Sequence, residues 1–362
     1  MKKNNILITL PDLRGKGGVS SFYKVVLPYL NNNLNIIILE IGSVHSKEKF
    51  FYKINDQINF YKKLIYERPN LVLINPSFYF KSFIRDGIFT WQAKRKKVNV
   101  IVFFHGWNWK FVRKVSNFLV LKWFFKKTFA KADAFIVLAS EFKKQLVRWQ
   151  IKVPIYLLTT AVEDSLLEGF DIKQKIEFLR NDKLVKLLFL ARIEKEKGIF
   201  ETVEAFKILI LKKLPVQLSI AGDGSVLNTI KQYVNSSHIK DKVNFLGYIK
   251  GKEKAKVFAE HDIYCFPTYG EGMPVSLLEA MAFGLPVVTR AVGGIKDFFQ
   301  NEKMGFITDS KEPQVISSFI EELVHDRTKL IKICEYNYNY AKKNFLASIV
   351  AKKMIKICKM YS

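Results

Sequence analysis

Short apolar segments recur along the chain in two series, with helical patterns between them. Their residues are apolar at successive positions, which is typical of parallel strands that are buried on both faces. The segments lie at 6–10, 36–39, 71–74, 98–104 and 134–138, and then at 186–190, 217–221, 243–246, 262–266, 286–289 and 305–308. Each series predicts a doubly wound α/β sheet, because helical crossovers connect parallel strands. A chain of 362 residues is long enough for two such domains.

An irregular, polar region at 159–182 separates the two series. We therefore predict an N-terminal Rossmann-like domain over residues 1–165 and a C-terminal one over residues 166–340. The last helical stretch of the chain breaks near Asn344. We expect the remaining residues, 341–362, to form a C-terminal helix that packs back on the N-terminal domain.

The positive charge of the chain is concentrated in its first part. The formal net charge is +26, and residues 1–165 hold 28 Lys and Arg against 10 Asp and Glu. Such an excess indicates an anionic partner, which membrane lipid, nucleic acid or a phosphorylated acceptor would each provide. No recognised nucleic-acid motif accompanies the charge, so nucleic acid is the least favoured of the three.

The segment 118–129 mixes bulky aromatic residues with lysines. A helix with Trp, Phe and Leu flanked by Lys can lie in a bilayer interface. The same pattern also fits an amphipathic helix that faces the core and keeps a basic edge in water. The sequence leaves both interpretations open.

The three cysteines, Cys265, Cys334 and Cys358, lack the spacing of a disulfide framework or a metal site. The apolar run at 6–10 ends at Pro11 and is too short for an export signal. No stretch reaches the roughly 18 apolar residues that a spanning helix needs. We therefore expect a reduced, cytoplasmic protein that is soluble or lies on a membrane surface.

The stretch 262–297 combines a strand, a loop with Gly and Pro, a short helix and a second strand. The helix is expected from about Val275 to Phe283, so that its N-terminus lies at the carboxyl edge of the sheet, where ligands of open α/β folds bind. Free N–H groups there favour an anion. Glu271 lies on the loop and Glu279 inside the helix. They are either two solvated glutamates beside a core helix or a ligand-binding pair, and the small residues around both favour the pair.

Two cations follow the first strand of the second series. Arg192 and Lys197 precede Gly198, which opens the next helix. Arg as a planar fork and Lys as a point charge would together bind a pyrophosphate. The alternative is a solvated charge run, since Glu194 and Glu196 alternate with the cations.

Four further strand ends carry candidate residues. The turn after the first strand contains Gly17 and Gly18, which serve either a tight turn or a close approach to a ligand. His105 directly follows the fourth strand, so we expect it to point into the ligand crevice. Gly222 and Tyr248 follow the next two strands of the second series, and each belongs to an ordinary turn unless a ligand lies above it.

Metal chemistry has little support in the sequence. The chain has no Asp-x-Asp, no His-Glu-x-x-His and no cysteine pair, and its five His residues are dispersed. We therefore predict no metal site and no cofactor. Arg, Lys and the helix dipole would have to neutralise a phosphate.

Together these residues resemble the retaining glycosyltransferases of family 4, whose signature Glu-x7-Glu is present as Glu271 and Glu279. The resemblance covers most of 187–309 and is thinner in the first domain, where it rests on Gly17–Gly18 and His105–Gly106. It implies an α/β fold of the GT-B type, with two facing Rossmann-like domains and a deep cleft between them. The N-terminal domain would be the acceptor side, and the C-terminal domain would bind a nucleotide sugar.

The resemblance also implies a role for each candidate. Glu271 would contact the donor sugar, and Glu279 would contact the ribose hydroxyls of the nucleotide. Arg192 and Lys197 would bind the diphosphate, and His105 would lie near the reacting sugar.

The remaining donor-binding residues carry over in the same way. Gly17 and Gly18 would close over the phosphates, and Tyr248 would lie near the base. The others expected to bind the donor are Gly222, Gly272, Met273, Pro274, Val275 and Ser276. Pro274 has no N–H group, so it cannot donate to a phosphate.

The resemblance implies a retaining, metal-independent hexosyltransferase. The donor is expected to be UDP-linked, and the acceptor a hydroxyl of a lipid-linked glycan in O-antigen, capsule or exopolysaccharide assembly. The basic N-terminal domain would meet an anionic membrane at the inner face of the plasma membrane. The alternatives are a nucleotide-sugar epimerase of the same fold and a basic protein that binds lipid or nucleic acid.

Overall fold

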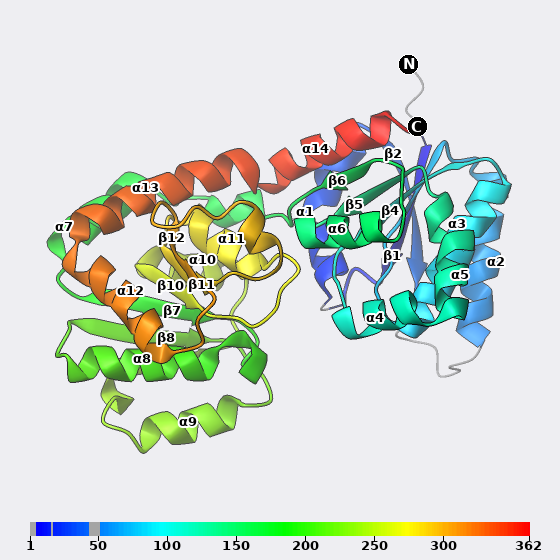
Figure 1. Cartoon of the computed structure of the whole chain (residues 1–362). Coiled ribbons are helices and arrows are strands. Elements are labelled where there is room, and N and C mark those ends of the chain that lie inside the picture. The colour runs from blue at the N-terminus through cyan, green and yellow to red at the C-terminus, as the bar shows by residue number, and fades with distance from the viewer. Residues whose placement is uncertain (1–4, 16, 43–50) are drawn as a thin grey trace. The chain divides into compact units, whose positions relative to one another are not determined.

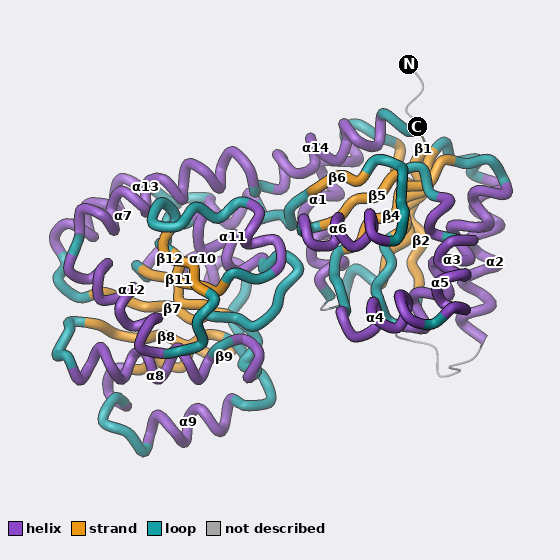
Figure 2. The backbone as a smooth tube through the Cα atoms, viewed as in Figure 1, coloured by secondary structure: helices purple, strands orange, loops and turns teal. Residues whose placement is uncertain are grey.

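A computed structural model describes residues 5–15, 17–42 and 51–362 of the chain. The chain divides into two compact units, which are treated separately here (Figure 1). Unit 1 comprises residues 1–161 together with 347–362, and unit 2 comprises residues 162–346. Both units are α/β, with helices on the faces of a central sheet (Figure 2).

Unit 1 is built on a parallel sheet of six strands in the order β2-β1-β3-β4-β5-β6. The strands are β1 (Asn5–Pro11), β2 (Asn35–Ile41), β3 (Leu71–Ile74), β4 (Asn99–Phe104), β5 (Ala134–Val137) and β6 (Ile155–Leu157). All residues of β3 and β5 are buried, as the continuous apolar pattern predicts. The short edge strand β6 is not predicted by the sequence, because its three residues are partly exposed and give no buried pattern.

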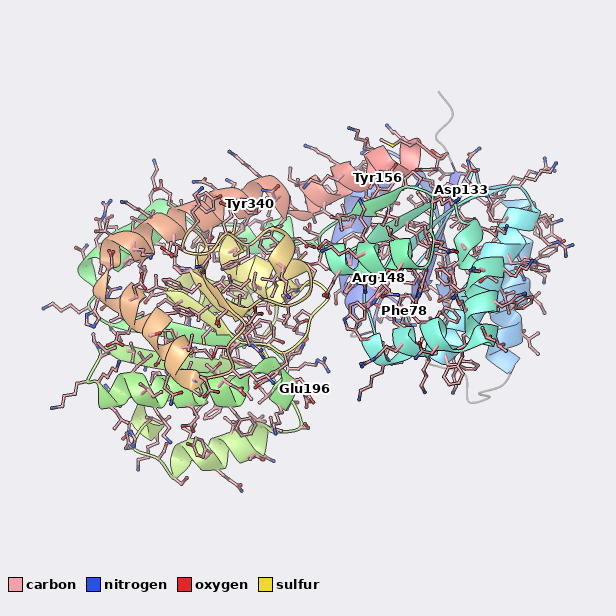
Figure 3. The ribbon with its side chains drawn as sticks, viewed as in Figure 1. Phe78, Asp133, Arg148, Tyr156, Glu196 and Tyr340 are labelled. Carbon is pink, nitrogen blue, oxygen red and sulfur yellow. The ribbon has the colours of Figure 1, made fainter. Side chains whose placement is uncertain are left out.

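The helices of unit 1 connect these strands and cover the sheet. They are α1 (Gly18–Asn31), α2 (Phe51–Tyr66), α3 (Phe80–Arg95), α4 (Trp109–Asn117), α5 (Leu119–Lys127), η1 (Phe129–Lys131), α6 (Ser140–Arg148) and α14 (Ala347–Lys359). The C-terminal helix α14 packs against α1. After α14, the carbonyl of Tyr361 accepts a hydrogen bond from Nδ2 of Asn99 at 2.8 Å, and its hydroxyl lies 3.1 Å from that of Tyr156 (Figure 3).

Unit 2 also has a parallel sheet of six strands, in the order β12-β11-β10-β7-β8-β9. The strands are β7 (Val185–Leu190), β8 (Val216–Ala221), β9 (Val243–Gly247), β10 (Ile263–Phe266), β11 (Val287–Arg290) and β12 (Gly305–Thr308). Every segment predicted as a strand in either half of the chain is one, which confirms the prediction of two Rossmann-like sheets.

The helices of unit 2 follow the same alternation. They are η2 (Asp164–Leu167), α7 (Ile172–Asn181), η3 (Lys195–Lys197), α8 (Ile199–Leu211), α9 (Leu227–Asn235), η4 (Lys240–Lys242), α10 (Gly251–Glu260), α11 (Val275–Ala282), η5 (Gly293–Asp297), α12 (Pro313–His325) and α13 (Arg327–Asn344). Shortly after α11, Gly284 has a φ of +78°, a conformation that favours glycine.

The two ends of unit 2 lie side by side. The N–H of Val162 donates to the carbonyl of Phe345 at 2.8 Å, and Val162 pairs with Leu346 in a parallel bridge. The compact unit runs from 162 to 346, whereas the predicted domain limits are 166 and 340. The pairing between distant residues leaves no local signal, which accounts for the difference.

Candidate functional site

The candidate site of unit 2 lies where the strand order reverses, between β7 and β10. These strands are neighbours in the sheet, with Leu187 opposite Ile263, so the loops that follow them leave the same edge. Ligands of open α/β sheets bind at such a switch point. The two loops touch: the N–H of Tyr269 donates to the carbonyl of Glu196 at 2.9 Å.

Gly198 allows this close contact between the two loops. Its φ is +79°, and a Cβ there would lie 2.3 Å from the carbonyl oxygen of Pro267. A larger residue would push the loops apart. The glycine predicted to open α8 therefore also positions the loop that carries Lys197.

Lys197 and Glu271 form an ion pair at the switch point, and each side chain is only 15% exposed. The hydroxyl of Thr268 lies 3.2 Å from Oε1 of Glu271 and also 3.2 Å from the carbonyl of Glu196. The sequence analysis assigned Lys197 to the diphosphate and Glu271 to the sugar. The structure brings the two together, and their opposite charges neutralise each other.

The charged residues around Arg192 differ in their partners and in their exposure to solvent. Glu194 accepts from the N–H of Ser225 at 3.1 Å and from its hydroxyl. These hydrogen bonds hold the pKa of Glu194 below its usual value, and the charge of Arg192 acts in the same direction. The side chain of Arg192 is exposed, as is that of Lys195. Lys197, which is largely buried in its ion pair, therefore does not belong to a solvated charge run.

Glu279 lies on the buried side of α11 and pairs with Lys254 of α10. The Nζ–Oε1 distance is 2.6 Å, and the Glu279 side chain is 6% exposed. Burial raises the pKa of Glu279, and the charge and hydrogen bond of Lys254 oppose that shift. Sequence reasoning missed Lys254, because one lysine in the Lys-rich stretch 250–256 gives no local signal.

Tyr264 of β10 holds the start of α11 in place. Its hydroxyl donates to the carbonyl of Leu190 at 2.8 Å and lies 2.8 Å from Oγ of Ser276. Pro274 precedes the helix, and Val275 and Ser276 form its first turn. The first turn, which is the predicted anion site, is thereby tied to the end of β7.

The loop before α11 also contacts the glycine pair after β11. The N–H of Gly294 donates to the carbonyl of Gly272 at 2.8 Å. Gly293 has a φ of +53°, and a Cβ there would lie 2.1 Å from the carbonyl oxygen of Glu271. These contacts fix the backbone that carries Glu271. Met273, on the same loop, is buried.

Gly222 has a structural reason to be glycine. Its φ is +136°, and a Cβ would lie 1.9 Å from the carbonyl oxygen of Ala191. Its N–H donates to the carbonyl of Gly247 at 2.7 Å, so the ends of β8 and β9 are joined at this edge. Tyr248 follows, with 64% of its surface exposed.

Gly17 and Gly18 lie at the start of α1 in unit 1, and both are exposed. A Cβ at Gly18 would meet nothing within 4 Å, and one at Gly17 would meet only the hydroxyl of Ser20 at 3.9 Å. Packing among the described residues therefore does not require either glycine. Both interpretations of this glycine pair, a tight turn and a close approach to a ligand, stay predictions.

His105 lies at the end of β4 in unit 1. Its Nε2 atom is 2.9 Å from Oδ1 of Asn75, and its ring lies 3.7 Å from the ring of Phe103. Burial lowers the pKa of His105 to about 3, so the imidazole is neutral at physiological pH. Asn75 was missed by sequence reasoning, because it stands alone after β3 and outside any motif.

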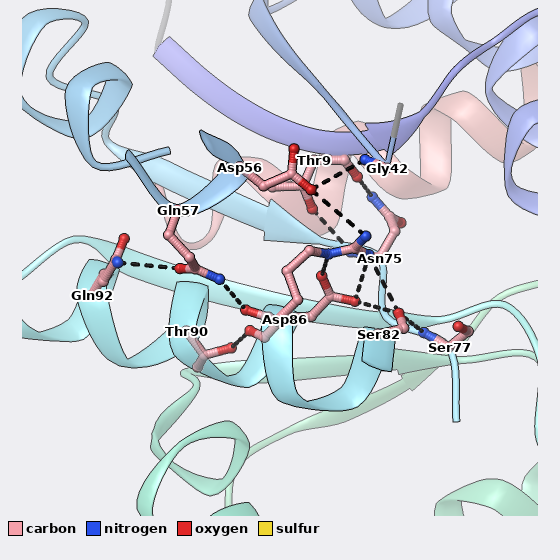
Figure 4. A network of polar contacts seen from close by, with 11 residues as sticks. Thr9, Gly42, Asp56, Gln57, Asn75, Ser77, Ser82, Asp86, Thr90 and Gln92 are labelled. Atoms are coloured by element: carbon pink, nitrogen blue, oxygen red, sulfur yellow. Dashed lines mark hydrogen bonds and ion pairs between the residues drawn. The ribbon is translucent and has the colours of Figure 1, made fainter. Parts of the chain in front are cut away.

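A buried polar network centred on α3 lies beside Asn75, which follows β3 (Figure 4). Nε of Arg85 donates to Oδ1 of Asp86 at 2.7 Å, and the Asp86 side chain is fully buried. Ser82 donates to the same carboxylate at 2.7 Å and accepts from the N–H of Ser77 at 3.3 Å. These bonds hold the start of α3 close to the end of β3.

The segment 118–129 forms α5 and the residues next to it. Only Phe125 of α5 is buried, and four apolar side chains are largely exposed, at 59%, 82%, 75% and 60% of their surfaces: Phe118, Leu119, Val120 and Trp123. Lys122 and Lys126 on the same helix are also exposed. We call these six residues the α5 surface. Phe124 and Phe125 of the same helix pack against Phe83 of α3, so α5 buries one side in the core and leaves the α5 surface in solvent.

No helix in the described ranges has the length and apolar character needed to cross a membrane.

A separate cavity of about 970 Å³ in unit 2 lies between α7 and α10. Its lining includes Leu184 and Asp262, which precede β7 and β10, so it opens at the edge of the sheet opposite the switch point. None of the residues expected to bind the donor lines it. The cavity is therefore distinct from the candidate site.

Residues 171–344 match the family described as glycosyl transferases group 1. The capsular polysaccharide biosynthesis glycosyltransferase CapM of Staphylococcus aureus is 28% identical over 177 residues, which are 46% of this chain and 43% of CapM. An Escherichia coli protein named UDP-Gal:alpha-D-GlcNAc-diphosphoundecaprenol alpha-1,3-galactosyltransferase is 26% identical over 230 residues, 61% of this chain and 58% of that protein. The chain spans about half the length of the curated relatives that it matches.

Among solved structures, Anabaena HepE in complex with UDP and glucose matches with a TM-score of 0.70 and 12% identity, over 99% of this chain and all of that one. At this identity the likeness shows the fold alone. Together with the two six-stranded parallel sheets, it confirms the predicted α/β fold of the GT-B type. The residues around the switch point lie within 171–344, the part of the second unit that matches the group 1 glycosyl transferases.

Proposed function

We propose that this protein is a retaining, metal-independent glycosyltransferase that moves a sugar from a UDP-linked donor to a hydroxyl of a lipid-linked glycan. The observation that carries the proposal is the ion pair of Lys197 and Glu271 at the switch point of a sheet that lies within the group 1 match. A nucleotide sugar offers a diphosphate for the cation and sugar hydroxyls for the carboxylate. Binding would thus replace one internal ion pair with two contacts to the donor.

The negative charge that would develop on the leaving nucleotide diphosphate gives the cations at the switch point a role in the reaction. The bond between the anomeric carbon and the phosphate oxygen breaks, and its electron pair stays on the nucleotide diphosphate. Lys197, Arg192 and the N–H groups at the start of α11 would stabilise that charge. Removing one such preorganised group typically costs about 10²–10³ in kcat. The cations take the part that a metal ion would otherwise play.

Retention of the anomeric configuration follows from attack on the same face that the phosphate leaves. The acceptor hydroxyl forms the new bond to the anomeric carbon, and its proton passes to a phosphate oxygen of the leaving group. Glu271 would hold the sugar, and Glu279 the ribose, with Tyr248 near the base. From unit 1, Gly17 and Gly18 would approach the phosphates and His105 the reacting sugar.

The donor and acceptor classes rest on the relatives. The name of the E. coli relative states a UDP-linked donor and a diphosphoundecaprenol acceptor, and HepE was solved with UDP. CapM is named for capsular polysaccharide biosynthesis. For this chain we propose a step in the assembly of O-antigen, capsule or exopolysaccharide.

A lipid-linked acceptor fits a protein that works at a membrane surface. Residues 1–165 hold most of the net positive charge, and the α5 surface places Leu119 and Trp123 in solvent beside Lys122 and Lys126. Lysines attract anionic headgroups, and the apolar side chains can enter the headgroup boundary. We propose a cytoplasmic protein bound peripherally at the inner face of the plasma membrane.

A panel of nucleotide sugars tests the donor first. Binding of the donor raises the melting temperature in proportion to affinity and concentration, so UDP-sugars should shift it more than GDP-sugars do. The donor that passes is then incubated with a lipid-linked glycan, with and without EDTA. We expect transfer that EDTA does not reduce and a product with the anomeric configuration of the donor sugar by NMR.

A reaction without acceptor provides the discriminating control. A nucleotide-sugar epimerase would convert the donor alone, whereas the proposed enzyme would leave it unchanged. Loss of transfer in EDTA would refute metal independence, and an inverted product would refute retention.

A further inference from the structure

The side-chain amide of Asn75 has a defined orientation. Its Nδ2 atom donates to the carbonyl of Thr9 at 2.9 Å, which only an N–H can do. Rotating the amide by 180° would place Oδ1 against that carbonyl, so two acceptors would face each other. Oδ1 is therefore the atom directed toward His105.

This orientation fixes the proton on His105. Oδ1 of Asn75 accepts from the hydroxyl of Tyr23 at 3.0 Å and lies 2.9 Å from Nε2 of His105. A carbonyl oxygen accepts two hydrogen bonds and donates none. Nε2 must therefore carry the proton, and Nδ1 of the neutral ring keeps a lone pair. Nδ1 is buried and has no hydrogen-bond partner within the described residues.

The surroundings of the ring keep it neutral and in place. The ring of Phe103 lies against it at 3.7 Å, tilted by 31°, and Phe22 meets it edge-on at 4.9 Å. The titratable groups nearby are the hydroxyl of Tyr23 and, beside Tyr23, the thiol of Cys358. Burial raises the pKa of Cys358 to about 12 and that of Tyr23 well above its usual value, so neither places a charge beside the imidazole at neutral pH.

We infer that Asn75 is a positioning residue, which holds His105 as the Nε2–H tautomer so that Nδ1 accepts a hydrogen bond from a sugar hydroxyl during transfer. The inference rests on the proposed function for the part that concerns the sugar. The tautomer itself is a property of unit 1 and can be measured without substrate. Experiments can therefore refute the tautomer of His105 and its contact with the sugar independently.

The tautomer is read by long-range ¹H–¹⁵N NMR on protein labelled with ¹⁵N-histidine, with the His105 signals assigned by their loss in His105→Asn. We expect wild type to show an unprotonated Nδ1 and a protonated Nε2. Asn75→Leu removes the acceptor for Nε2 and should give a mixture of tautomers. A proton on Nδ1 in wild type, or an unchanged tautomer in Asn75→Leu, would overturn the inference.

A pH profile of kcat separates positioning from a merely structural role. In Asn75→Asp, a carboxylate beside Nε2 favours the imidazolium, whose Nδ1 carries a proton and cannot accept. We expect kcat of this variant to fall at least tenfold at pH 6 relative to wild type and to recover toward wild type as the pH rises. A constant loss at all pH values would overturn the role of Asn75.

Ser82→Ala is the matched control, because Ser82 belongs to the neighbouring network of unit 1 without contacting His105 (Figure 4). It should leave both the tautomer and the pH profile of wild type. The melting temperatures of all variants are measured in parallel, so that misfolding is distinguished from a lost tautomer. If wild type transfers no sugar from any donor, the proposed function fails while the NMR result still decides the tautomer.

Discussion

Nζ of Lys254 lies 2.6 Å from Oε1 of Glu279, so a buried carboxylate on α11 has its cation on α10. The two helices are separated in sequence by β10 and its loop. This pair lies on the same helix whose first turn is tied to β7 by Tyr264. It explains how a carboxylate with 6% exposure is held on the buried side of α11.

Replacing Lys254 by Met should destabilise unit 2. The change leaves the Glu279 carboxylate buried without its cation, which typically costs about 3–5 kcal/mol. We expect a lower melting temperature and a higher KM for the donor, because an uncharged Glu279 is a weaker acceptor for ribose hydroxyls. Lys256→Met serves as control, since Lys256 pairs with Glu260 at 3.8 Å and both side chains are more than half exposed. Equal effects of the two variants would contradict the prediction.

Replacing Lys197 by Met should abolish most transfer without unfolding the protein. The leaving diphosphate would lose a preorganised cation, for which we expect kcat to fall about 10²–10³-fold. Glu271→Gln should likewise reduce kcat/KM, because it weakens the contacts to the sugar. Lys212→Met is a matched control, since Lys212 pairs with Glu321 at 2.5 Å and follows the last residue of α8, whereas Lys197 precedes that helix. Full activity of Lys197→Met in the transfer assay would remove Lys197 from the site.

Gly222→Ala should be strongly destabilising. The residue has a φ of +136°, and the added Cβ would lie 1.9 Å from the carbonyl oxygen of Ala191. Strained backbone of this kind costs roughly 1–3 kcal/mol before the clash is counted. Gly106→Ala provides the comparison, because a Cβ there meets nothing within 4 Å. Urea unfolding should show a clear loss for Gly222→Ala and little change for Gly106→Ala.

His261 should make unit 2 less stable as the pH drops below about 6.5. Burial lowers the pKa of His261 to about 4, with Lys175 and Lys186 acting in the same direction and the carbonyl of Val257 opposing. Between the unfolded value of 6.5 and about 4, the unfolded chain binds the proton and the folded unit does not. The free energy of unfolding therefore falls by up to about 1.4 kcal/mol per pH unit from this residue.

His261→Gln isolates this contribution, because glutamine takes up no proton in that range. Urea unfolding at several pH values between 7 and 4.5 should give a shallower dependence for the variant, whatever its stability at pH 7. Parallel curves for wild type and variant would contradict the assigned pKa shift.

The α5 surface should control binding to anionic vesicles. Burying Leu119 and Trp123 in the headgroup boundary would contribute about 1.5–3 kcal/mol each. The double change Leu119→Ser with Trp123→Ser should therefore weaken cosedimentation with anionic vesicles at least tenfold. Phe178→Ser is the control, since Phe178 is 65% exposed on α7 of unit 2. Raising the salt should weaken wild-type binding, because the lysine contribution is screened.

The sequence by itself determined the two Rossmann-like sheets. It also identified four charged residues of the candidate site. Buried parallel strands are apolar at successive positions, so each strand can be recognised from its own residues. Only the partly exposed edge strand β6 was not predicted. Glu271 and Glu279 were found because a loop and the helix after it keep a fixed spacing along the chain. Arg192 and Lys197 were found because they directly follow a strand.

Only the tertiary structure decided which of these groups meet. Strand order places β7 beside β10, and this brings Lys197 to Glu271 across 74 positions of sequence. The same kind of contact pairs Lys254 with Glu279 and sets Asn75 against His105, 25 and 30 positions apart. Such pairs depend on sheet order and helix packing, which are non-local, so the pairing of the two residues leaves no local pattern. The charged groups of the site could therefore be identified from the sequence, whereas their partners are determined by the tertiary structure.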